Sequence, residues 1–282
     1  MNKKVWLITG CSTGLGRAIA TQILDSGHNV AVASRKTEDV QDLVTKYPNA
    51  YPVKLDLTKT DEIHAAVESV TRHFGTIDVL VNNAGIGYFA AIEESEEEAV
   101  RRMFEINFFG LAAMVKAVLP LFRARRSGHI INIASVGGLI AYPAIGFYHA
   151  TKFAVDGYSE SLYKEVSPLG IKVTIVAPSG FRTEWAGNNA TGSPVVINDY
   201  ADTAHKYKAA YIAAYGKQAG DPARAAKAIE QITENPTPPL RLLLGAEALS
   251  EARRKLEELR SDFDQWEATT IHADFPAEEV SR

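Results

Sequence analysis

The sequence predicts an α/β protein built on an open, doubly wound parallel sheet of seven strands. Short apolar runs alternate with amphipathic stretches along the chain, which is the order that successive strand and helix units produce. Several runs are apolar at every position, as expected for strands that helices cover on both faces. A glycine-rich segment, residues 9–16, directly follows the first run. Its place between a strand and a helix is typical of nucleotide-binding sheets.

Seven apolar runs are predicted to be strands. They span Val5–Thr9, Asn29–Ala33, Tyr51–Leu55, Ile77–Val81, His129–Ala134, Lys172–Ala177 and Leu240–Leu244. Apolar residues at helical spacing fill most of the gaps between them. The predicted helices are Gly14–Ser26, Thr37–Lys46, Lys59–Phe74, Glu96–Phe122, Tyr148–Val166 and a helix from Pro222 to about Glu234.

Two helix starts carry local signals. Asp221 and Pro222 pair a capping residue with a first-turn proline. Ser95 and Glu98 have the spacing of a capping box in front of the long fourth helix. Both patterns predict where backbone N–H groups at a helix end find an acceptor.

The chain is predicted to form a single domain over residues 1–282. No internal repeat, low-complexity tract or linker divides it. Residues 180–220 are rich in Gly, Asn, Thr, Tyr and Ala with weak periodicity, so we interpret them as a substrate-loop insertion. Residues from about 246 onward are expected to form a helical tail.

Composition excludes several classes of function. The formal net charge of −4 gives no field that would attract nucleic acid or an anionic membrane. A single cysteine, Cys11, excludes an internal disulfide and fits a reducing compartment. The first apolar run is too short for a signal peptide, and we expect no membrane-spanning stretch, so a cytoplasmic location is predicted. The seven histidines show no ligand spacing, and no metal site is predicted.

Gly10, Gly14 and Gly16 predict an anion-binding turn at the start of the first helix. Without a Cβ atom, backbone N–H groups and the helix N-terminus can approach a pyrophosphate closely. A plain glycine turn is the alternative, which the position after a buried strand and before a helix disfavours. The intervening residues expected to contact the nucleotide are Ser12, Thr13 and Leu15.

Ser34, Arg35 and Lys36 end the second predicted strand and bear on which dinucleotide binds. An NAD-selective site places a carboxylate here to hold the ribose 2′-hydroxyl, whereas Ser34 is neutral. Arg35 and Lys36 are cations suited to a 2′-phosphate. The alternative is that both are only solvated residues ahead of the next helix. The pattern favours NADP(H), with NAD(H) as the alternative.

Tyr148 and Lys152 stand four residues apart in a predicted helix, so they share one face. A phenol with a pKa near ~10 needs tuning to exchange protons at neutral pH. We expect the Lys152 ammonium, helped by an oxidised nicotinamide, to lower the pKa of Tyr148. Ser135 ends the fifth predicted strand, where it can hydrogen-bond the same substrate oxygen.

These motifs, in this order and spacing, resemble the short-chain dehydrogenase/reductase family. The resemblance covers roughly residues 3–183 and rests on the segment 9–16, Asn82 to Gly85, Asn107, Ser135 and the pair Tyr148 and Lys152. Residues 239–245 are similar to a bacterial branch related to hydroxysteroid and retinol dehydrogenases. The resemblance implies a Rossmann-type fold and an NADP(H)-dependent interconversion of a secondary alcohol and a ketone, with Tyr148 as the general acid/base.

The resemblance also implies further roles. Asn107, Ser135, Tyr148 and Lys152 form a catalytic tetrad, in which Asn107 fixes a water that links Lys152 to solvent and Lys152 also holds the nicotinamide ribose. The implied nucleotide contacts are Asp56 and Leu57 at the adenine, Asn83, Ala84 and Gly85 at the adenosine side, and Pro178 and Thr183 at the nicotinamide. Ser179 stands where the family commonly has glycine. A homodimer or homotetramer through the fourth and fifth helices is expected, and the apolar segment Met103–Leu121 is compatible with it.

Tyr142, Phe181 and Trp185 are candidates for the substrate pocket, with Tyr200 as a further lid candidate. Aromatic residues in a loop can equally pack against the fold. His149 is expected to point away from the site. The alternative function is a non-catalytic NADP(H)-binding sensor or scaffold, which the intact tetrad opposes. An epimerase or dehydratase is disfavoured, because such relatives usually carry longer substrate domains.

Overall fold

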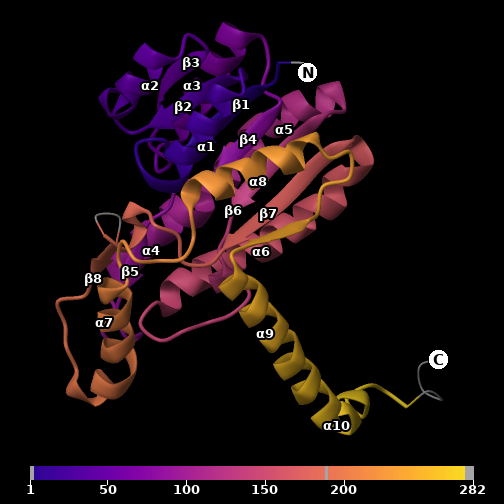
Figure 1. Cartoon of the computed structure of the whole chain (residues 1–282). Coiled ribbons are helices and arrows are strands. Elements are labelled where there is room, and N and C mark those ends of the chain that lie inside the picture. The colour runs from indigo at the N-terminus through magenta and orange to yellow at the C-terminus, as the bar shows by residue number, and fades with distance from the viewer. Residues whose placement is uncertain (1–2, 188–189, 277–282) are drawn as a thin grey trace.

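The computed structural model describes residues 3–187 and 190–276. All seven predicted strands are present and form one parallel sheet in the order β3-β2-β1-β4-β6-β7-β9 (Figure 1). Their bounds are β1 Val5–Thr9, β2 Asn29–Ser34, β3 Ala50–Lys54, β4 Val79–Asn82, β6 Gly128–Ile133, β7 Ile171–Pro178 and β9 Arg241–Leu244. The chain winds outward from β1 to β3 and then returns to β4 on the other side of β1. Ligands of such sheets bind outside the carboxyl ends of the strands, at this point of reversal.

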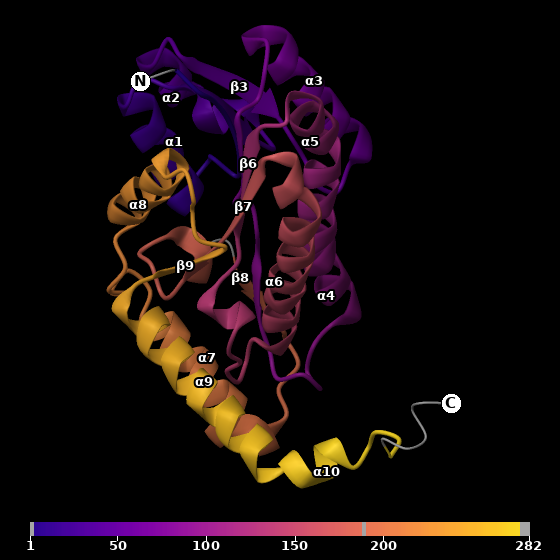
Figure 2. The same cartoon turned by 90° about the vertical axis from the view of Figure 1, so that its right-hand side faces the viewer.

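Helices cover both faces of the sheet, as Figure 2 shows with the sheet nearly edge-on. The helices on one face are α3 Thr60–Phe74, α5 Leu111–Arg125 and α6 Gly146–Val166, and those on the other are α1 Gly14–Asp25, α2 Gln41–Lys46 and α8 Pro222–Glu234. Alternate residues of β1 enter the two cores: Val5 and Leu7 face α3 and α5, while Trp6 and Ile8 face α1. Burial of successive residues on both faces explains why the strands are continuously apolar.

The fourth predicted helix is interrupted. It consists of α4 Glu97–Phe104, a π-helical turn Glu105–Gly110 and α5. The predicted capping box is wrong, because the Ser95 hydroxyl donates to the Ala91 carbonyl at 2.9 Å and α4 begins after Glu96 without a side-chain cap. By contrast, the Asp221 carboxylate accepts from the Ala223 N–H at 2.8 Å, which confirms the predicted cap of α8.

The helical stretch Glu97–Arg125 is also long and apolar enough to cross a membrane by length and composition. The expectation that no stretch meets those two criteria is therefore wrong. Met114, Val118 and Phe122 are fully buried in the core beneath the sheet. Packing against the sheet accounts for the buried part of this stretch, which is 33% of its most apolar window.

Several elements of the structure were not predicted from the sequence. A second, two-stranded parallel sheet joins β5 Gly87–Phe89 to β8 Ala190–Gly192. Helix α7 Lys206–Ala213 is likewise additional, whereas α9 Ala246–Gln265 and α10 Glu267–Ile271 lie in the helical tail expected from about residue 246. Short 3-10 turns span Thr37–Val40, Val136–Gly138, Ser167–Leu169, Glu184–Ala186 and Asn198–Tyr200, and a second π turn spans Ala201–His205. Figure 1 shows β5, β8 and α7 gathered at one end of the sheet, with α9 leading away from it.

Candidate active site

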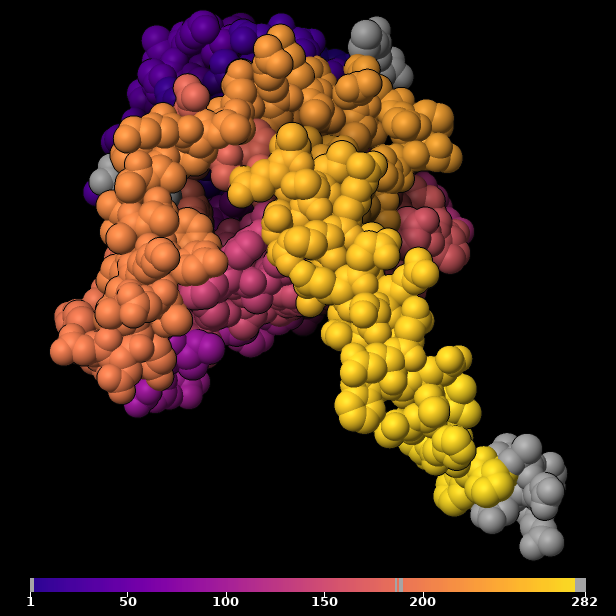
Figure 3. Space-filling model, turned by 60° about the horizontal axis from the view of Figure 1, so that its bottom comes forward, coloured from indigo at the N-terminus to yellow at the C-terminus, as the bar shows by residue number. Residues whose placement is uncertain are grey.

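A cavity of about 670 Å³ lies at the carboxyl ends of the strands, where the strand order reverses. Residues that follow β1, β2, β3, β4, β6 and β7 line it, together with residues of α7 and the start of α9. Figure 3 shows the recess on this face, bordered by the orange segment that carries α7. Its volume falls in the usual range for ligand pockets.

The glycine turn after β1 forms one wall of this cavity. Gly10 and Gly14 have φ of +72° and +60°, a left-handed conformation that favours glycine. A Cβ on Gly10 would lie 2.9 Å from the Ala84 Cα, so the turn packs directly against the chain after β4. The predicted nucleotide contacts of this turn that line the cavity are Gly10, Ser12, Thr13, Gly14 and Leu15. Gly16 does not line it, because its Cα faces the Gly10 carbonyl oxygen, which a Cβ would approach to 2.3 Å.

Asn83 ties the glycine turn to the end of β4. Its side-chain amide donates to the carbonyl oxygens of Thr9 and Gly10 at 3.0 and 3.2 Å. The Thr9 hydroxyl in turn accepts from the N–H groups of Asn83 and Ala84 at 3.0 and 3.1 Å. Asn83, Ala84 and Gly85 all line the cavity as predicted. The strands on either side of the reversal are therefore held together by side-chain bonds.

The ends of β2 and β3 form the far wall. Arg35 lines the cavity and is exposed, whereas Lys36 does not line it. The buried Ser34 hydroxyl donates to the Lys36 carbonyl at 2.5 Å and so fixes this turn. Asp56 and Leu57 line the cavity. The position of Lys36 corrects the expectation that both cations face the nucleotide.

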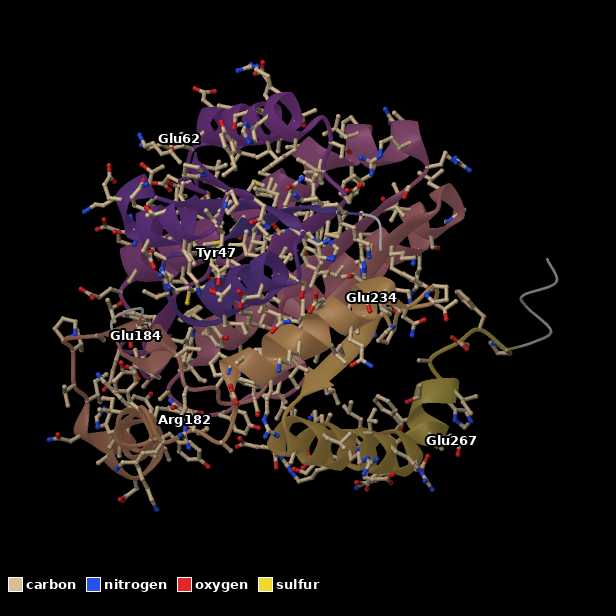
Figure 4. All side chains as sticks on the ribbon, turned by 45° about the horizontal axis from the view of Figure 1, so that its top comes forward. Tyr47, Glu62, Arg182, Glu184, Glu234 and Glu267 are labelled. Carbon is tan, nitrogen blue, oxygen red and sulfur yellow. The ribbon has the colours of Figure 1, made fainter. Side chains whose placement is uncertain are left out.

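Asp56 keeps its charge in this wall. Burial alone would raise the pKa of its carboxyl, but hydrogen bonds from Thr58 and the charges of Lys59 and Arg35 lower it overall. The Glu62 carboxylate on α3, labelled in Figure 4, accepts from the Asp56 N–H at 2.9 Å and supports the loop from behind. Arg35 and Asp56 both line the cavity, so an acid and a base face this wall together.

Tyr148 and Lys152 lie one turn apart on α6, and both are buried. The Lys152 Nζ donates to the Ile133 carbonyl at 2.8 Å and lies 5.7 Å from the centre of the Tyr148 ring. Ser135 follows β6 and opens a 3-10 turn, in which its hydroxyl accepts from the Gly137 N–H at 3.0 Å. All three predicted residues line the same part of the cavity.

Burial decides the protonation of this cluster. It raises the pKa of Tyr148 to about 12, although a hydrogen bond with Ser135 opposes the rise. Burial also lowers the pKa of Lys152 to about 8. That the Lys152 ammonium lowers the pKa of the phenol with the help of an oxidised nicotinamide stays a prediction. At neutral pH, Tyr148 is therefore a phenol that holds its proton, and Lys152 carries its charge.

Asn107 lies in the π-helical turn, behind the cavity rather than on its surface. Its Oδ1 accepts from the Ile86 N–H at 2.8 Å, and its Nδ2 donates to the Ile86 carbonyl at 2.9 Å and to the Thr151 hydroxyl at 3.2 Å. A Cβ on Gly85 would lie 3.2 Å from Asn107 Oδ1 and 3.9 Å from Lys152 Nζ. Asn107 thus fixes the backbone beside Lys152.

His149 lines the cavity, contrary to the expectation that it points away. Its Nε2 accepts from the Tyr142 N–H at 2.8 Å, so the proton of the neutral ring lies on Nδ1, which donates to the Gly137 carbonyl at 2.8 Å. Burial lowers the pKa of His149 despite these bonds. The neutral ring therefore fixes the loop after Ser135 to α6 through these two hydrogen bonds.

The remaining wall is aromatic and apolar. Tyr142, Phe181 and Trp185 line the cavity as predicted, and the Trp185 ring centre lies 4.8 Å from that of Tyr148. Tyr200 does not line it, because its hydroxyl donates to Glu93 at 2.5 Å. Pro178 and Thr183 line the cavity beside this wall. The lining residues that sequence reasoning missed here are Val136, Ile145, Tyr207, Ala210, Tyr211, Ala214, Gln218 and Glu247.

The spacing of Tyr207, Ala210, Tyr211 and Ala214 was the available signal for α7, since residues three and four apart share a helix face. Besides Arg35 and Asp56 at the ends of β2 and β3, the charged side chains that line the cavity, among residues in the described part of the chain, are Arg102, Lys152 and Glu247. The buried Gln218 Oε1 has no protein partner among the described residues, so it is free to accept from a ligand donor.

A buried carboxylate holds the segment that carries α7. Glu94 accepts from the N–H groups of Ala91 and Ile197 at 3.2 and 2.7 Å and lies 2.7 Å from the His205 Nε2. Its carbonyl oxygen accepts from the Ser193 hydroxyl at 2.6 Å. Burial would raise the pKa of Glu94, but these hydrogen bonds lower it overall. Glu94 is thus the anchor of α7 on the body of the protein.

A second set of contacts fixes the other end of this segment. The Arg182 guanidinium donates to the Gln218 carbonyl at 2.6 Å, and the Tyr215 hydroxyl donates to Glu184 at 2.7 Å. Figure 4 labels Arg182 and Glu184, which lie where the chain leaves β7 toward α7. Both contacts join the loop after β7 to the segment that follows α7.

Comparisons with known proteins agree with this geometry. Residues 4–193 match the family described as short chain dehydrogenase. An oxidoreductase of Botryotinia fuckeliana is 36% identical, over 95% of this chain and 98% of its own. A 3-ketodihydrosphingosine reductase of Bacteroides thetaiotaomicron is 41% identical, over 72% of this chain and 74% of its own.

A crystal structure of a short-chain dehydrogenase from Streptomyces avermitilis superposes with a TM-score of 0.91 at 38% identity, over 97% of this chain and 99% of that one. Two structures from Burkholderia species, each 24% identical, share the fold, and one holds NAD while the other holds NADP. The strand order, the cavity at its reversal and these matches lead to one conclusion. The chain belongs to the short-chain dehydrogenase/reductase family of oxidoreductases, which act on small molecules.

Proposed function

We propose that this protein uses NADP(H) to interconvert a secondary alcohol and a ketone, with Tyr148 as the general acid/base. One observation carries the proposal: a buried, protonated phenol lines the cavity beside Ser135 and Lys152. Tyr148 is the group in this cluster that can hand a proton to a carbonyl oxygen at neutral pH. The 3-ketodihydrosphingosine reductase among the relatives supports a ketone as the substrate.

The residues present fit a dinucleotide. Gly10 and Gly14 present backbone without a Cβ at the start of α1, where a pyrophosphate binds favourably. Asp56 and Leu57 would hold the adenine, and Pro178 and Thr183 would contact the nicotinamide. The bound nicotinamide would supply a hydride to the carbonyl carbon.

The protein's own side chains would manage the proton and the charge. Tyr148 donates its proton to the carbonyl oxygen as negative charge develops there, and Ser135 donates a hydrogen bond to the same oxygen. The Lys152 ammonium stabilises the phenolate that remains. Trp185, whose ring packs against Tyr148, excludes water from this end of the cavity. In the oxidation direction, the same groups act in reverse.

The aromatic wall supports a particular kind of substrate. Tyr142, Trp185, Tyr207 and Tyr211 surround the space beyond Tyr148, and the cavity lining carries both an acidic side chain, Glu247, and a basic one, Arg102. Because aromatic side chains dominate this end, we expect an apolar ketone.

Arg35 supports NADP(H) over NAD(H). It is exposed on the cavity side of β2, next to a serine that carries no charge to repel a 2′-phosphate. A guanidinium binds phosphate with two parallel hydrogen bonds.

The test measures NADPH oxidation with matched ketones that are neutral, cationic or anionic. Tyr148→Phe should keep NADPH binding but lower turnover by roughly 10²- to 10⁴-fold, because it removes the proton donor. Tyr163→Phe, an exposed tyrosine on the same helix, is the matched control and should leave turnover unchanged. If wild-type protein binds NADPH and oxidises it with none of the ketones, the non-catalytic sensor becomes the better explanation. Appreciable turnover by Tyr148→Phe would rule out Tyr148 as the acid.

A further inference from the structure

Helix α9 leaves the body of the protein after its first two turns. Ala248 and Ala252 are buried, and Ala248 packs against Val136 and Ile140 near the cavity. Beyond them the helix extends away from the body of the protein, as the yellow segment in Figure 3 shows. This part of α9 therefore gains no support from the core.

The projecting helix carries a regular apolar stripe. We call it the α9 stripe: Leu249, Ala252, Leu256, Leu259, Phe263 and Trp266, of which Ala252 is buried against the body of the same chain. Its members are spaced alternately three and four residues apart, which is the heptad pattern of a helix that packs against a second helix. Leu256, Phe263 and Trp266 are 65%, 67% and 59% exposed. Large apolar side chains in one exposed row mark an interaction surface.

We propose that the α9 stripe pairs with the α9 stripe of a second copy of this chain, the two helices running antiparallel. Full overlap places Leu256 against the partner's Leu259 and Leu249 against the partner's Trp266, while Phe263 meets the partner beside the buried Ala252, at the edge of the body. Two-fold symmetry repeats each contact. A two-fold axis requires such a self-complementary surface.

Charges beside the stripe select the antiparallel direction. In this alignment Lys255 faces the partner's Asp262, and symmetry provides the pair twice. A parallel pair would instead bring Lys255 to the partner's Arg260 and Asp262 to the partner's Glu267, which are like charges. Flanking residues of this kind set partner choice and orientation in paired helices.

The opposite flank does not undo this preference. There Arg253 faces the partner's Arg260, which is a like-charge contact. Arg260 already lies 3.8 Å from Glu257 and 3.6 Å from Asp264 within its own helix. Those carboxylates reduce the repulsion. Lys255 also lies 3.8 Å from Glu258 in its own helix, which weakens its attraction to the partner's Asp262 without changing the sign of that contact.

Pairing would also affect the cavity. Glu247, in the first turn of α9, lines the rim, and the Tyr142 hydroxyl donates to Glu251 at 3.2 Å. A second copy that holds α9 therefore holds one side of the substrate end. The proposal does not depend on which reaction the site performs.

Disulfide trapping in the full-length protein tests the pairing directly. Leu256→Cys is mixed with a size-tagged Leu259→Cys protein under a mild oxidant. Antiparallel pairing predicts that the mixed disulfide dominates, whereas parallel pairing predicts the two homodimers. Ser261→Cys, on the opposite side of α9, measures random collision. The native Cys11 is fully buried, and burial raises the pKa of its thiol to about 12, so it does not compete.

A charge exchange provides a second, independent readout by sedimentation. Lys255→Glu should weaken dimerisation by about tenfold, because it turns two attractive contacts into repulsive ones. The double variant Lys255→Glu, Asp262→Lys should restore it. In a parallel pair Lys255→Glu would strengthen association instead, by attracting the partner's Arg260. Dominant homodimer disulfides, or trapping no faster than with Ser261→Cys, would overturn the proposal.

Discussion

Replacing the buried Lys152 by methionine should make the protein more stable at neutral pH while removing its activity. Burial lowers the pKa of Lys152 from 10.5 to about 8. One pKa unit corresponds to about 1.4 kcal/mol, so the buried ammonium costs about 3.5 kcal/mol of folding free energy. Methionine has a similar length and carries no charge. It forgoes the hydrogen bond of the ammonium to Ile133, and a hydrogen bond to a charged group contributes about 1.5–3 kcal/mol. The expected net gain is therefore about 0.5–2 kcal/mol.

The pH dependence of this gain is its signature. Below about pH 8 the lysine is charged in both the folded and the unfolded chain, so the wild-type protein bears the whole penalty. Between there and the unfolded pKa of 10.5, the folded chain releases its proton first and the wild-type protein gains stability. The advantage of Lys152→Met should thus be largest near pH 7 and shrink as the pH rises toward 10.

Denaturant unfolding of wild type and Lys152→Met across this pH range gives the measurement. Lys164→Met is the matched control, because Lys164 is an exposed lysine on the same helix that pairs with Glu160. It should change the free energy of unfolding by no more than about 0.5 kcal/mol. A Lys152→Met protein that is less stable than wild type at pH 7 would refute the idea that the buried ammonium lowers the free energy of unfolding.

Three further predictions concern the cofactor, the anchor of α7 and the assembly. Arg35→Ala should raise the KM for NADPH about tenfold or more and barely change that for NADH, and Ser34→Asp should shift preference toward NADH; steady-state kinetics with both cofactors would contradict this if wild type prefers NADH. Glu94→Gln should raise the KM for the ketone and leave the KM for NADPH unchanged, since the lost contacts position α7; equal changes in both would place the effect elsewhere. Phe109, 53% exposed on the π turn before α5, is expected to lie between subunits of a dimer or tetramer, so Phe109→Glu should reduce the mass found by light scattering. A wild-type protein that is monomeric at micromolar concentration would refute that interface.

The sheet and the central catalytic residues could be predicted because their signals are local. Each strand is a run of apolar residues buried on both faces, as in β1. Tyr148 and Lys152 are four residues apart, and in any α-helix this spacing places two side chains on the same face. The glycine turn was predictable for the same reason, since φ above zero at Gly10 and Gly14 restricts the residue type.

Features that depend on distant contacts could not be predicted. The strands β5 and β8 contain three residues each, too few for a period to appear. His149 was misjudged because helical geometry alone turns it away from Tyr148, whereas the turn after Ser135 folds back to meet it. The pKa of Tyr148 depends on burial by Trp185 and its neighbours, which no spacing encodes. Ser95 stands in a capping sequence, but its hydroxyl donates to the Ala91 carbonyl instead of capping α4.

The π-helical turn at Glu105–Gly110 makes this region sensitive to chain length. A π turn holds one residue more than the α-helical turn it replaces. Deleting a residue there would let the segment close into an unbroken α-helix and rotate everything before it by about 100° relative to α5. The buried Met103 and the bonds from Asn107 to Ile86 would then lose their places. The extra residue of the π turn therefore sets the rotation of α4 about the helix axis relative to α5. Deletions should be tolerated less well here than substitutions.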